Sequence, residues 1–459
     1  MSQPDLSAIV KAYDIRGLVP EQLDEDVVRA LGAAFGRLVA AEGATGVVTA
    51  HDMRASSVPL SRAFAAGVTS QGIDVVEAGL GSTDMLYFAS GTLAQPGAMF
   101  TASHNPAQYN GIKLSRAGAA PVGQDTGLAQ VRAGAERFLA DGIPAADAPG
   151  SVRTADLLTA YAAHLRTLVD LTDLRPLTVV VDAGNGMGGH TVPAVWGDAV
   201  LPPLPLKVVP LYFELDGTFP NHEANPLDPA NIVDLQAAVR AHGADLGIAF
   251  DGDADRCFVV DERGEPVSPS AITALVAVRE LAKDPGGTVI HNLITSRAVP
   301  EIVAEHGGTP VRTRVGHSFI KAEMARTGAI FGGEHSAHYY FRDFWRADTG
   351  MLAAMHVLAA LGASELPLST LAADYERYVG SGEVNSRVDD PAARMRAVEL
   401  AYAGAEVDHL DGLTVSFADR SWFNLRPSNT EPLLRLNVEA ADAGRMAALR
   451  DEVLALVRS

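Results

Sequence analysis

Over roughly the first 370 residues, short runs of β-branched residues alternate with longer Ala/Leu-rich amphipathic stretches. The alternation is typical of α/β layers, because strands and helices show different periods of apolar positions. It predicts a helix over 27–41 followed by a strand at 47–49, and a strand over 177–181 with a helix over 231–241. Each of these helices is expected to end at a nearby glycine.

The pattern changes in the last part of the chain, where strands near 413–417, 422–425 and 433–438 precede a closing helix. A chain of 459 residues also exceeds the size of a single core. The segment 141–150 has linker composition and is expected to end the first domain. We therefore predict α/β architecture: three similar mixed α/β domains plus a C-terminal α+β domain around a central active-site cleft. The expected domains are 1–150, 151–256, 257–368 and 369–459.

Composition narrows the class of protein. Hydrophobic residues make up 47% and charged residues 20%, as in soluble globular proteins. The single cysteine, Cys257, excludes an intrachain disulfide framework and fits a cytoplasmic location. The first residues lack the features of a signal peptide. The longest apolar stretch, 351–363, is shorter than the ~20 residues of a membrane span, so we expect a buried helix there.

The charge balance disfavours a nucleic-acid partner. Lys and Arg total 36 against 56 Asp and Glu, a net charge of −20, and no dense basic run is present. An anionic substrate would therefore need cations concentrated at its site.

Three polar motifs each follow a predicted strand. Ser103 follows 98–100, Asp251 follows 246–250, and Glu334 follows 329–331. Functional loops of α/β sheets gather outside the carboxyl ends of strands. Because these ends are far apart in the sequence, we expect three similar domains to face one cleft.

Ser103 is the candidate nucleophile, because the tight Ser-His-Asn-Pro turn would hold its hydroxyl away from the strand. An ST-turn or a helix cap is the structural alternative for such a serine. His104 beside it could orient the serine or contact a phosphate, although a histidine in a turn is often only a surface donor.

Asp251, Asp253 and Asp255 alternate with small residues, so three carboxylates can converge, and hard anionic oxygens suit Mg²⁺. A phosphate on Ser103 could supply the next ligand oxygen. An acidic surface turn is one alternative. An EF-hand fails because Arg256 replaces the required glycine and no helix leads into the loop. A third alternative is an aspartate-nucleophile phosphatase, with Asp251 phosphorylated and Asp253 as acid/base.

The run Gly184 to Gly189 satisfies G-x-G-x-x-G, with Glu214 roughly where a dinucleotide site has its acidic residue. A lone match is weak evidence, so a structural glycine-rich turn stays open beside the cofactor hypothesis.

Two further motifs suit sugar and phosphate. Glu334 and Ser336 alternate along an extended loop and can bind a vicinal pair of hydroxyls. A compact donor set that can surround a phosphate dianion consists of Arg426, Ser428, Asn429 and Thr430. Helix capping is an alternative for Ser428 or Asn429, but it does not explain the arginine.

Together, and in this order, the motifs around Ser103, Asp251, Glu334 and Arg426 resemble those of the α-D-phosphohexomutases of the phosphomannomutase/phosphoglucomutase type. The resemblance runs from Lys11 almost to the C-terminus. It implies interconversion of hexose 6-phosphate and hexose 1-phosphate, with mannose and/or glucose as the sugar. It also implies a phosphoserine at Ser103, a Mg²⁺ ion, a hexose 1,6-bisphosphate intermediate and activator, a phosphosugar as the partner, and a monomer or weak dimer.

The resemblance carries roles to further residues. Tyr13 and Arg16 resemble the motif behind the phosphoserine, Lys113 the lysine near the serine, and Arg256 the arginine that joins the metal loop to the substrate. Residues that resemble substrate-contacting or acid/base positions are His317, Lys321 and His338.

Some positions depart from the family pattern and leave alternatives open. Ala337 stands where glycine is usual, and Ile294 where relatives often have a sugar-contacting lysine. Arg297 and Lys321 are the two candidates to substitute for that lysine. His335 fits the mannose/glucose enzymes, since the glucosamine enzymes usually carry Gln there. A phosphoglucosamine mutase, the aspartate-nucleophile sugar phosphatase and a non-catalytic phosphosugar-binding protein remain the rival hypotheses.

Overall fold

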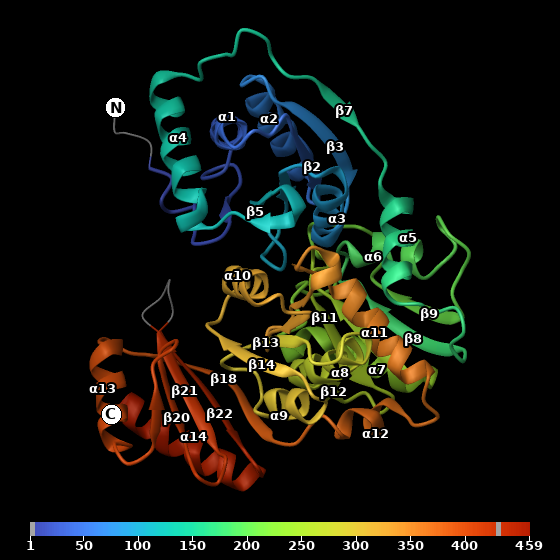
Figure 1. Cartoon of the computed structure of the whole chain (residues 1–459), viewed down its shortest axis with the longest axis vertical. Coiled ribbons are helices and arrows are strands. Elements are labelled where there is room, and N and C mark those ends of the chain that lie inside the picture. The colour runs from blue at the N-terminus through green and yellow to red at the C-terminus, as the bar shows by residue number, and fades with distance from the viewer. Residues whose placement is uncertain (1–4, 428–432) are drawn as a thin grey trace. The chain divides into compact units, whose positions relative to one another are not determined.

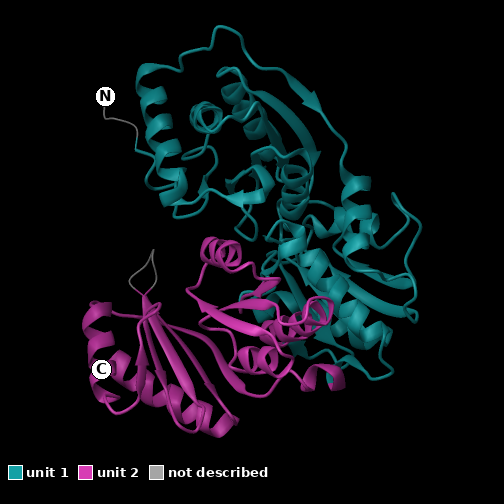
Figure 2. Ribbon diagram, in the orientation of Figure 1, with its two compact units in different colours: residues 1–267, 336–369 teal, residues 268–335, 370–459 magenta. Residues whose placement is uncertain are grey.

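The computed structural model of the protein describes residues 5–427 and 433–459 (Figure 1). The chain divides into two compact units (Figure 2). Unit 1 comprises residues 1–267 and 336–369, and unit 2 comprises residues 268–335 and 370–459.

The first sheet of unit 1 has the strand order β1-β5-β4-β2-β3-β7, and β6 pairs with β5. The bounds are β1 Ile15–Leu18, β2 Gly46–His51, β3 Asp74–Leu80, β4 Gly97–Phe100, β5 Tyr109–Arg116, β6 Ala120–Pro121 and β7 Val152–Thr154. Strands β3, β2 and β4 are parallel, whereas β5 is antiparallel to β4 and β1. β7 lies beyond the expected linker and returns to the edge of this sheet beside β3.

Helices cover both faces of the first sheet. Val47 packs in the core with α1 (Glu25–Ala41), α2 (Ser57–Thr69) and α4 (Leu128–Asp141). The next residue, Val48, packs with α3 (Thr83–Leu93) on the other face. Burial on both faces explains why the strand is a continuous apolar run. The helix predicted from residue 27 begins at Glu25, because the Asp24 side chain caps it by accepting from the Val27 N–H.

The second sheet of unit 1 has the order β12-β11-β10-β8-β9. The bounds are β8 Leu177–Asp182, β9 Leu206–Leu211, β10 Leu246–Phe250, β11 Cys257–Asp261 and β12 Pro266–Val267. Its associated helices are α5 Leu158–Leu168, α6 Gly188–Val195 and α7 Val233–His242. The helix predicted from residue 231 begins at Val233, because residues 229–232 form a short 3₁₀ turn. Cys257 is fully buried in β11, and burial raises the pKa of its thiol.

Unit 1 also contains the hairpin of β16 (Tyr339–Phe341) and β17 (Ala347–Asp348), followed by α11 (Gly350–Gly362). The apolar stretch 351–363 is thus the buried helix that the sequence predicts. Among the described residues, no helix is long and apolar enough to cross a membrane.

Unit 2 contains two groups of strands. In the first, β13 (Thr288–Asn292) pairs in parallel with β14 (Thr309–Thr313) and β15 (Phe331–Gly333). Its helices are α8 Pro269–Lys283, α9 Ala298–Glu305 and α10 His317–Thr327. The strand predicted at 329–331 begins instead at Phe331 and continues through two glycines, because residues 331–333 pair with β13. Glycine is required at 333, since a Cβ there would lie 2.4 Å from the Thr273 side chain.

The second group is an antiparallel sheet of order β18-β22-β21-β20-β19. The bounds are β18 Val379–Arg387, β19 Glu406–Asp408, β20 Leu413–Ser416, β21 Trp422–Pro427 and β22 Leu433–Ala440, with helices α13 Pro391–Ala401 and α14 Ala443–Arg458. The short helix α12 (Leu368–Ala373) begins in unit 1 and ends in unit 2. The three strands and the closing helix predicted for this region are present. The mixed α/β sheets and this C-terminal α+β part confirm the predicted fold class.

Candidate active site

Ser103 lies in the turn after β4, with its backbone in the left-handed region at φ 50°. Its N–H donates to Thr101 Oγ1 over 2.9 Å. Its hydroxyl donates to Asp251 Oδ2 over 2.7 Å, although the two residues are 148 positions apart. The turn thus directs the hydroxyl to the loop after β10, in agreement with the expectation that strand ends bring these motifs together.

The three aspartates of that loop are buried: Asp251 and Asp253 are 0% exposed and Asp255 is 1% exposed. Carboxylate oxygens of all three lie within 4.8 Å of one another. Within the described residues, Asp253 Oδ1 and Asp255 Oδ1 are buried and have no hydrogen-bond partner. Buried anionic oxygens without donors fit a divalent cation that prefers oxygen ligands.

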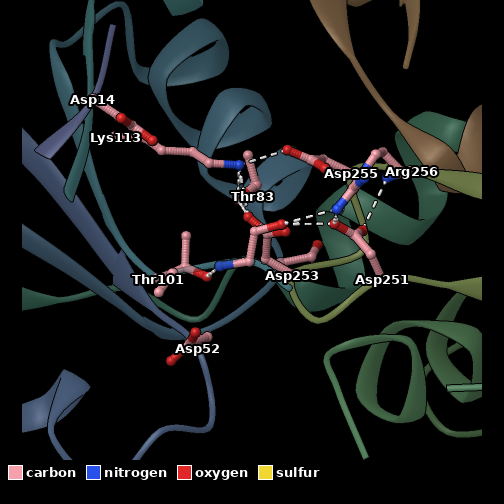
Figure 3. A network of polar contacts seen from close by, with 12 residues as sticks. Asp14, Asp52, Thr83, Thr101, Lys113, Asp251, Asp253, Asp255 and Arg256 are labelled. Carbon is pink, nitrogen blue, oxygen red and sulfur yellow. Dashed lines mark hydrogen bonds and ion pairs between the residues drawn. The ribbon is translucent and has the colours of Figure 1, made fainter. Parts of the chain in front are cut away.

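Two cations face the aspartates (Figure 3). Lys113 of β5 places Nζ 2.7 Å from Asp253 Oδ2 and 2.5 Å from Asp255 Oδ2. Arg256 donates from Nε to Asp251 Oδ2 over 2.9 Å, and its Nη2 lies 2.8 Å from the same oxygen. The site therefore holds the local positive charge that an acidic protein needs to admit an anion.

Burial raises the pKa values of the aspartate carboxyl groups, and the neighbouring cations lower them. Burial raises the pKa of Asp251 to about 6, and the Arg256 guanidinium only partly offsets it. Burial would also raise the pKa of Asp253, but Lys113 and the Thr83 hydroxyl hold the pKa of this carboxyl below its usual range.

Thr83, the first residue of α3, binds Asp253 through two hydrogen bonds. The Thr83 Oγ1 hydroxyl donates to Asp253 Oδ2 over 2.5 Å, and its N–H donates to the Asp253 carbonyl over 3.0 Å. Thr83 is fully buried. The next residue, Asp84, accepts hydrogen bonds from the hydroxyls of Tyr161 and Thr349, so α3 is tied to α5 and α11 beside the aspartates.

His104 lies against the nucleophile. Its Nδ1 is 3.2 Å from Ser103 Oγ and 2.5 Å from Arg256 Nη2. Burial and the adjacent Arg256 lower the pKa of His104 to about 2. The imidazole is therefore neutral at physiological pH, and its Nδ1 accepts the hydrogen bond from the guanidinium.

Arg16 of β1 contacts the serine turn from the other side. Its Nη1 donates to the Ala102 carbonyl over 3.0 Å and to the Asn105 side chain. Its Nε donates to Asp14 over 2.7 Å. Tyr13, directly before Asp14, is 36% exposed.

His338, in the loop before β16, is the remaining predicted residue near the aspartates. Its Nδ1 lies 3.1 Å from Asp348 Oδ2 and 3.9 Å from Asp255 Oδ1. Burial would lower the pKa of His338, but Asp255 and Asp348 raise it above its ordinary value. Ser336 is half-buried in the same loop, which also contains Ala337 at φ 65°.

The predicted residues of unit 2 lie at the ends of its strands. Glu334 is 2% exposed and accepts from the Asn292 amide over 3.1 Å and from the Gly316 N–H over 3.2 Å. His317 begins α10, and Lys321 is buried one turn later. These residues belong to one small region, because Asn292 ends β13 and Gly316 precedes α10.

Of the motif predicted to bind phosphate, only Arg426 lies among the described residues. Arg426 near the end of β21 is 8% exposed, and its Nη2 donates to Glu383 Oε2 over 2.8 Å. Ser428, Asn429 and Thr430 lie outside the described residues.

Two alternative interpretations of the sequence, an EF-hand and a dinucleotide-binding turn, can be compared with the structure. The aspartate loop connects strand β10 to strand β11, so it is not an EF-hand. The glycine-rich turn after β8 packs against the aspartate loop: the Met187 N–H donates to the Gly252 carbonyl over 2.9 Å, and a Cβ on Gly186 would lie 2.6 Å from that oxygen. Close packing against backbone thus accounts for a glycine in this turn, in favour of the structural alternative.

Sequence reasoning missed Arg54, Thr83 and Asp348. Arg54 follows β2 and Thr83 begins the helix after β3, so both stand just beyond strand ends, where Ser103 and Asp251 were found. The same rule applied to every strand would have selected them. Asp348 had no such signal, because its contact with His338 arises from the β16–β17 hairpin.

Comparisons with known proteins agree with this arrangement. Family profiles described as "Phosphoglucomutase/phosphomannomutase, alpha/beta/alpha" domains I, II and III match residues 7–137, 159–264 and 268–378, and the C-terminal domain profile matches 383–456. The chain is 42% identical over 456 residues to a protein of Salmonella montevideo named phosphomannomutase, covering 98% of each chain. A protein of Xanthomonas campestris named phosphohexose mutases is 42% identical over 454 residues, again covering 98% of each.

Among solved structures, a phosphoglucomutase/phosphomannomutase family protein of Burkholderia thailandensis superimposes with a TM-score of 0.87 at 33% identity, covering 98% of this chain and 97% of that one. The matches span all the predicted motifs in their order. This chain therefore belongs to the phosphoglucomutase/phosphomannomutase family.

Proposed function

We propose that the protein interconverts hexose 6-phosphate and hexose 1-phosphate by way of a phosphoserine at Ser103. The observation that carries the proposal is the Ser103 hydroxyl, 2.7 Å from Asp251 and enclosed by buried carboxylates and cations. Membership of the family supports the same reaction class, an intramolecular phosphotransfer, and disfavours an aspartate nucleophile. Two relatives bear the names phosphomannomutase and phosphohexose mutases, which supports mannose and/or glucose as the sugar.

The reaction would proceed in two transfers. The phosphoryl group of phospho-Ser103 passes to the free hydroxyl of the hexose phosphate: a bond from phosphorus to the sugar oxygen forms and the bond to Ser103 Oγ breaks. The proton of the sugar hydroxyl is given up and Ser103 Oγ takes up a proton in its place, so the serine hydroxyl is restored. The resulting hexose 1,6-bisphosphate turns over in the site. Ser103 Oγ then accepts the other phosphoryl group: a bond from phosphorus to Ser103 Oγ forms and the bond to the second sugar oxygen breaks. Ser103 gives up its proton and that sugar oxygen takes up a proton, so the enzyme regains its phosphoserine.

The residues around Ser103 would promote both transfers by placing charge and donors in advance. Arg256 Nη2, 3.5 Å from Ser103 Oγ, faces the atoms where negative charge develops. His104 is neutral, so its ring can accept a hydrogen bond beside the serine. Lys113 is held by Asp253 and Asp255 at a fixed place next to the transfer site.

A Mg²⁺ ion would be held by Asp251, Asp253 and Asp255, whose clustered oxygens fit it, with Ser103 or its phosphate adding a ligand. When bound, the ion supplies positive charge that neutralises the transferring phosphoryl group. Thr83 fixes the orientation of Asp253 for this purpose.

Substrate recognition would come from the remaining predicted residues. Glu334 and Ser336 bind sugar hydroxyls, and His317, Lys321 and His338 contact the substrate or transfer protons. Arg426, with Ser428, Asn429 and Thr430, holds the phosphate that is not being transferred, which fixes the sugar for reaction. Tyr13 and Arg16 support the serine turn, as the contacts of Arg16 suggest.

The first test is phosphopeptide mapping after incubation of the protein with glucose 1,6-bisphosphate and Mg²⁺. We expect acid-stable phosphate on Ser103 in the wild type and none there in Ser103→Ala. The matched control, Ser61→Ala, replaces another buried serine, on α2, and should be phosphorylated like the wild type. Phosphate on Asp251 would overturn the proposal in favour of a phosphatase, and absence of phosphate would favour a binding protein.

Rates of conversion of mannose 1-phosphate, glucose 1-phosphate and glucosamine 1-phosphate would then assign the sugar. The proposal requires the glucosamine substrate to react most slowly.

A further inference from the structure

The guanidinium of Arg54 lies under the Ser103 turn. Arg54 stands just after β2 and is 2% exposed. It donates to four backbone carbonyls of this turn: Nη2 to Ser103 over 2.9 Å and to Asn105 over 2.6 Å, and Nη1 to Pro106 and Tyr109, each over 2.9 Å. A single side chain thus binds the backbone at the nucleophile and at three of the residues that follow it.

All side-chain N–H donors of Arg54 form hydrogen bonds within the protein. An arginine has five N–H donors in a planar fork. Four go to the turn, and the fifth, Nε–H, donates to Asp52 Oδ2 over 3.2 Å. Asp52 is itself fixed, because it also accepts from the Arg54 N–H and the Ser57 hydroxyl. Arg54 therefore has no donor left for a substrate.

The face of the guanidinium is covered as well. The ring of Phe219 lies over it, 5.0 Å from the guanidinium carbon to the ring centroid. A Cβ on Gly217 would lie 2.7 Å from Arg54 Cα, so the backbone around residue 217 packs directly against this residue. The guanidinium is enclosed at its edge by carbonyls and at its face by an aromatic ring.

The Ser103 turn needs such a cation. Its carbonyl oxygens converge on one point, where they would repel one another without a donor between them. Ser103 also adopts φ 50°, a region that side-chain-bearing residues adopt only when their surroundings hold them there. In this conformation the hydroxyl reaches Asp251.

We infer that Arg54 is a positioning residue for phosphoryl transfer: it holds the turn in the strained form that presents Ser103 Oγ to the aspartates. The inference rests on the proposed role of Ser103 as phosphoryl carrier. Arg16 differs, because it binds one carbonyl and one side chain of the turn and lies beside Asp14. Lysine cannot replace Arg54, since an ammonium has three donors and no planar fork.

The test compares Arg54→Lys with a matched control. Arg166→Lys changes another arginine that donates to backbone carbonyls, those of Val195, Pro202 and Gly197, away from the serine turn. Single-turnover phosphorylation of Ser103 by glucose 1,6-bisphosphate is measured together with kcat and KM, after circular dichroism has established that each variant is folded.

We expect Arg54→Lys to lower kcat and the phosphorylation rate by about 10²-fold, as misplacement of a reacting group by about 1 Å does, with KM changed less than about threefold. Arg166→Lys should leave both rates within about threefold of wild type. Retention of the wild-type phosphorylation rate by folded Arg54→Lys would overturn the inference, as would an equal loss in Arg166→Lys.

The proposed function can fail separately, because then the wild type itself would carry no phosphate on Ser103. If Arg54→Lys does not fold, Asp52→Asn replaces it and weakens the orientation of the fork without removing the guanidinium. A fall in kcat of about tenfold at unchanged KM would support the inference, and an unchanged kcat would overturn it.

Discussion

Replacement of Thr83 by valine isolates one hydrogen bond of the aspartate loop. The two side chains have nearly the same shape, and Thr83 is fully buried, so the main loss is the hydroxyl that donates to Asp253 Oδ2 over 2.5 Å. Lys113 still donates to the same oxygen, so the carboxylate keeps a partner. The Thr83 N–H also keeps its bond to the Asp253 carbonyl. The expected effect is therefore a less well fixed ligand in a folded protein.

The magnitude follows from the charge of the acceptor. A hydrogen bond to a charged group contributes about 1.5–3 kcal/mol, which corresponds to roughly 10- to 100-fold in an equilibrium constant. Loss of a residue that orients a metal ligand typically weakens metal affinity by about the same factor. We expect the Mg²⁺ concentration for half-maximal mutase activity to rise by about 10- to 100-fold in Thr83→Val, with kcat recovering at high Mg²⁺.

The assay is the initial rate of hexose 1-phosphate conversion at saturating substrate, as a function of Mg²⁺. Thr83→Ser is the matched control, because it keeps the hydroxyl and removes only a methyl group. The serine variant should need nearly the same Mg²⁺ concentration as the wild type. An unchanged Mg²⁺ requirement in Thr83→Val, or an equal change in Thr83→Ser, would refute the reasoning and assign the effect to packing.

Three further predictions concern pH, backbone strain and substrate binding. Burial raises the pKa of Asp84 to about 6, so the stability that its protonated form contributes is present at acid pH and is lost as pH rises through that value. Between pH 5 and 7.5 the free energy of unfolding of the wild type, measured in urea, should fall by about 1 kcal/mol more than that of Asp84→Asn. Equal pH profiles would contradict this. Ala337 adopts φ 65°, so Ala337→Gly should raise the free energy of unfolding by about 0.5–1 kcal/mol, and a decrease would show that the alanine methyl packs favourably. Arg426→Ala should raise KM for hexose phosphate by about 10- to 100-fold with kcat little changed, whereas a fall in kcat alone would place the arginine at the transfer step.

The sequence predicted the strand ends that carry the site, because an apolar run followed by a polar turn is a local signal. Ser103 and Asp251 each follow such a run and meet in the structure. The partners of these residues were harder to predict. Arg54 donates to backbone carbonyls, and Thr83 donates to a single buried carboxylate oxygen. Both contacts depend on how loops from separate strands come together.

Errors in the element bounds also have local physical causes. The glycines at 332 and 333 disfavour a strand by propensity, yet β15 includes them because both pair with β13. The side chain of Thr273 leaves no room for a Cβ at Gly333, which explains the glycine there. The glycine-rich turn after β8 resembled a cofactor motif for a similar reason. Its small residues allow close approach to the Gly252 backbone, and the sequence alone does not reveal whether a ligand or a polypeptide occupies that space.

The burial of Cys257 has a practical consequence for experiments in solution. It is the only cysteine in the chain, it is fully buried, and its thiol has a raised pKa, so maleimide reagents should not modify it in the folded protein. Cysteines introduced at exposed positions, such as Asp26→Cys in unit 1 and Leu400→Cys in unit 2, would then be the sole labelling sites. The natural sequence is thus a ready background for paired fluorophores or spin labels that report the distance between the two units during turnover.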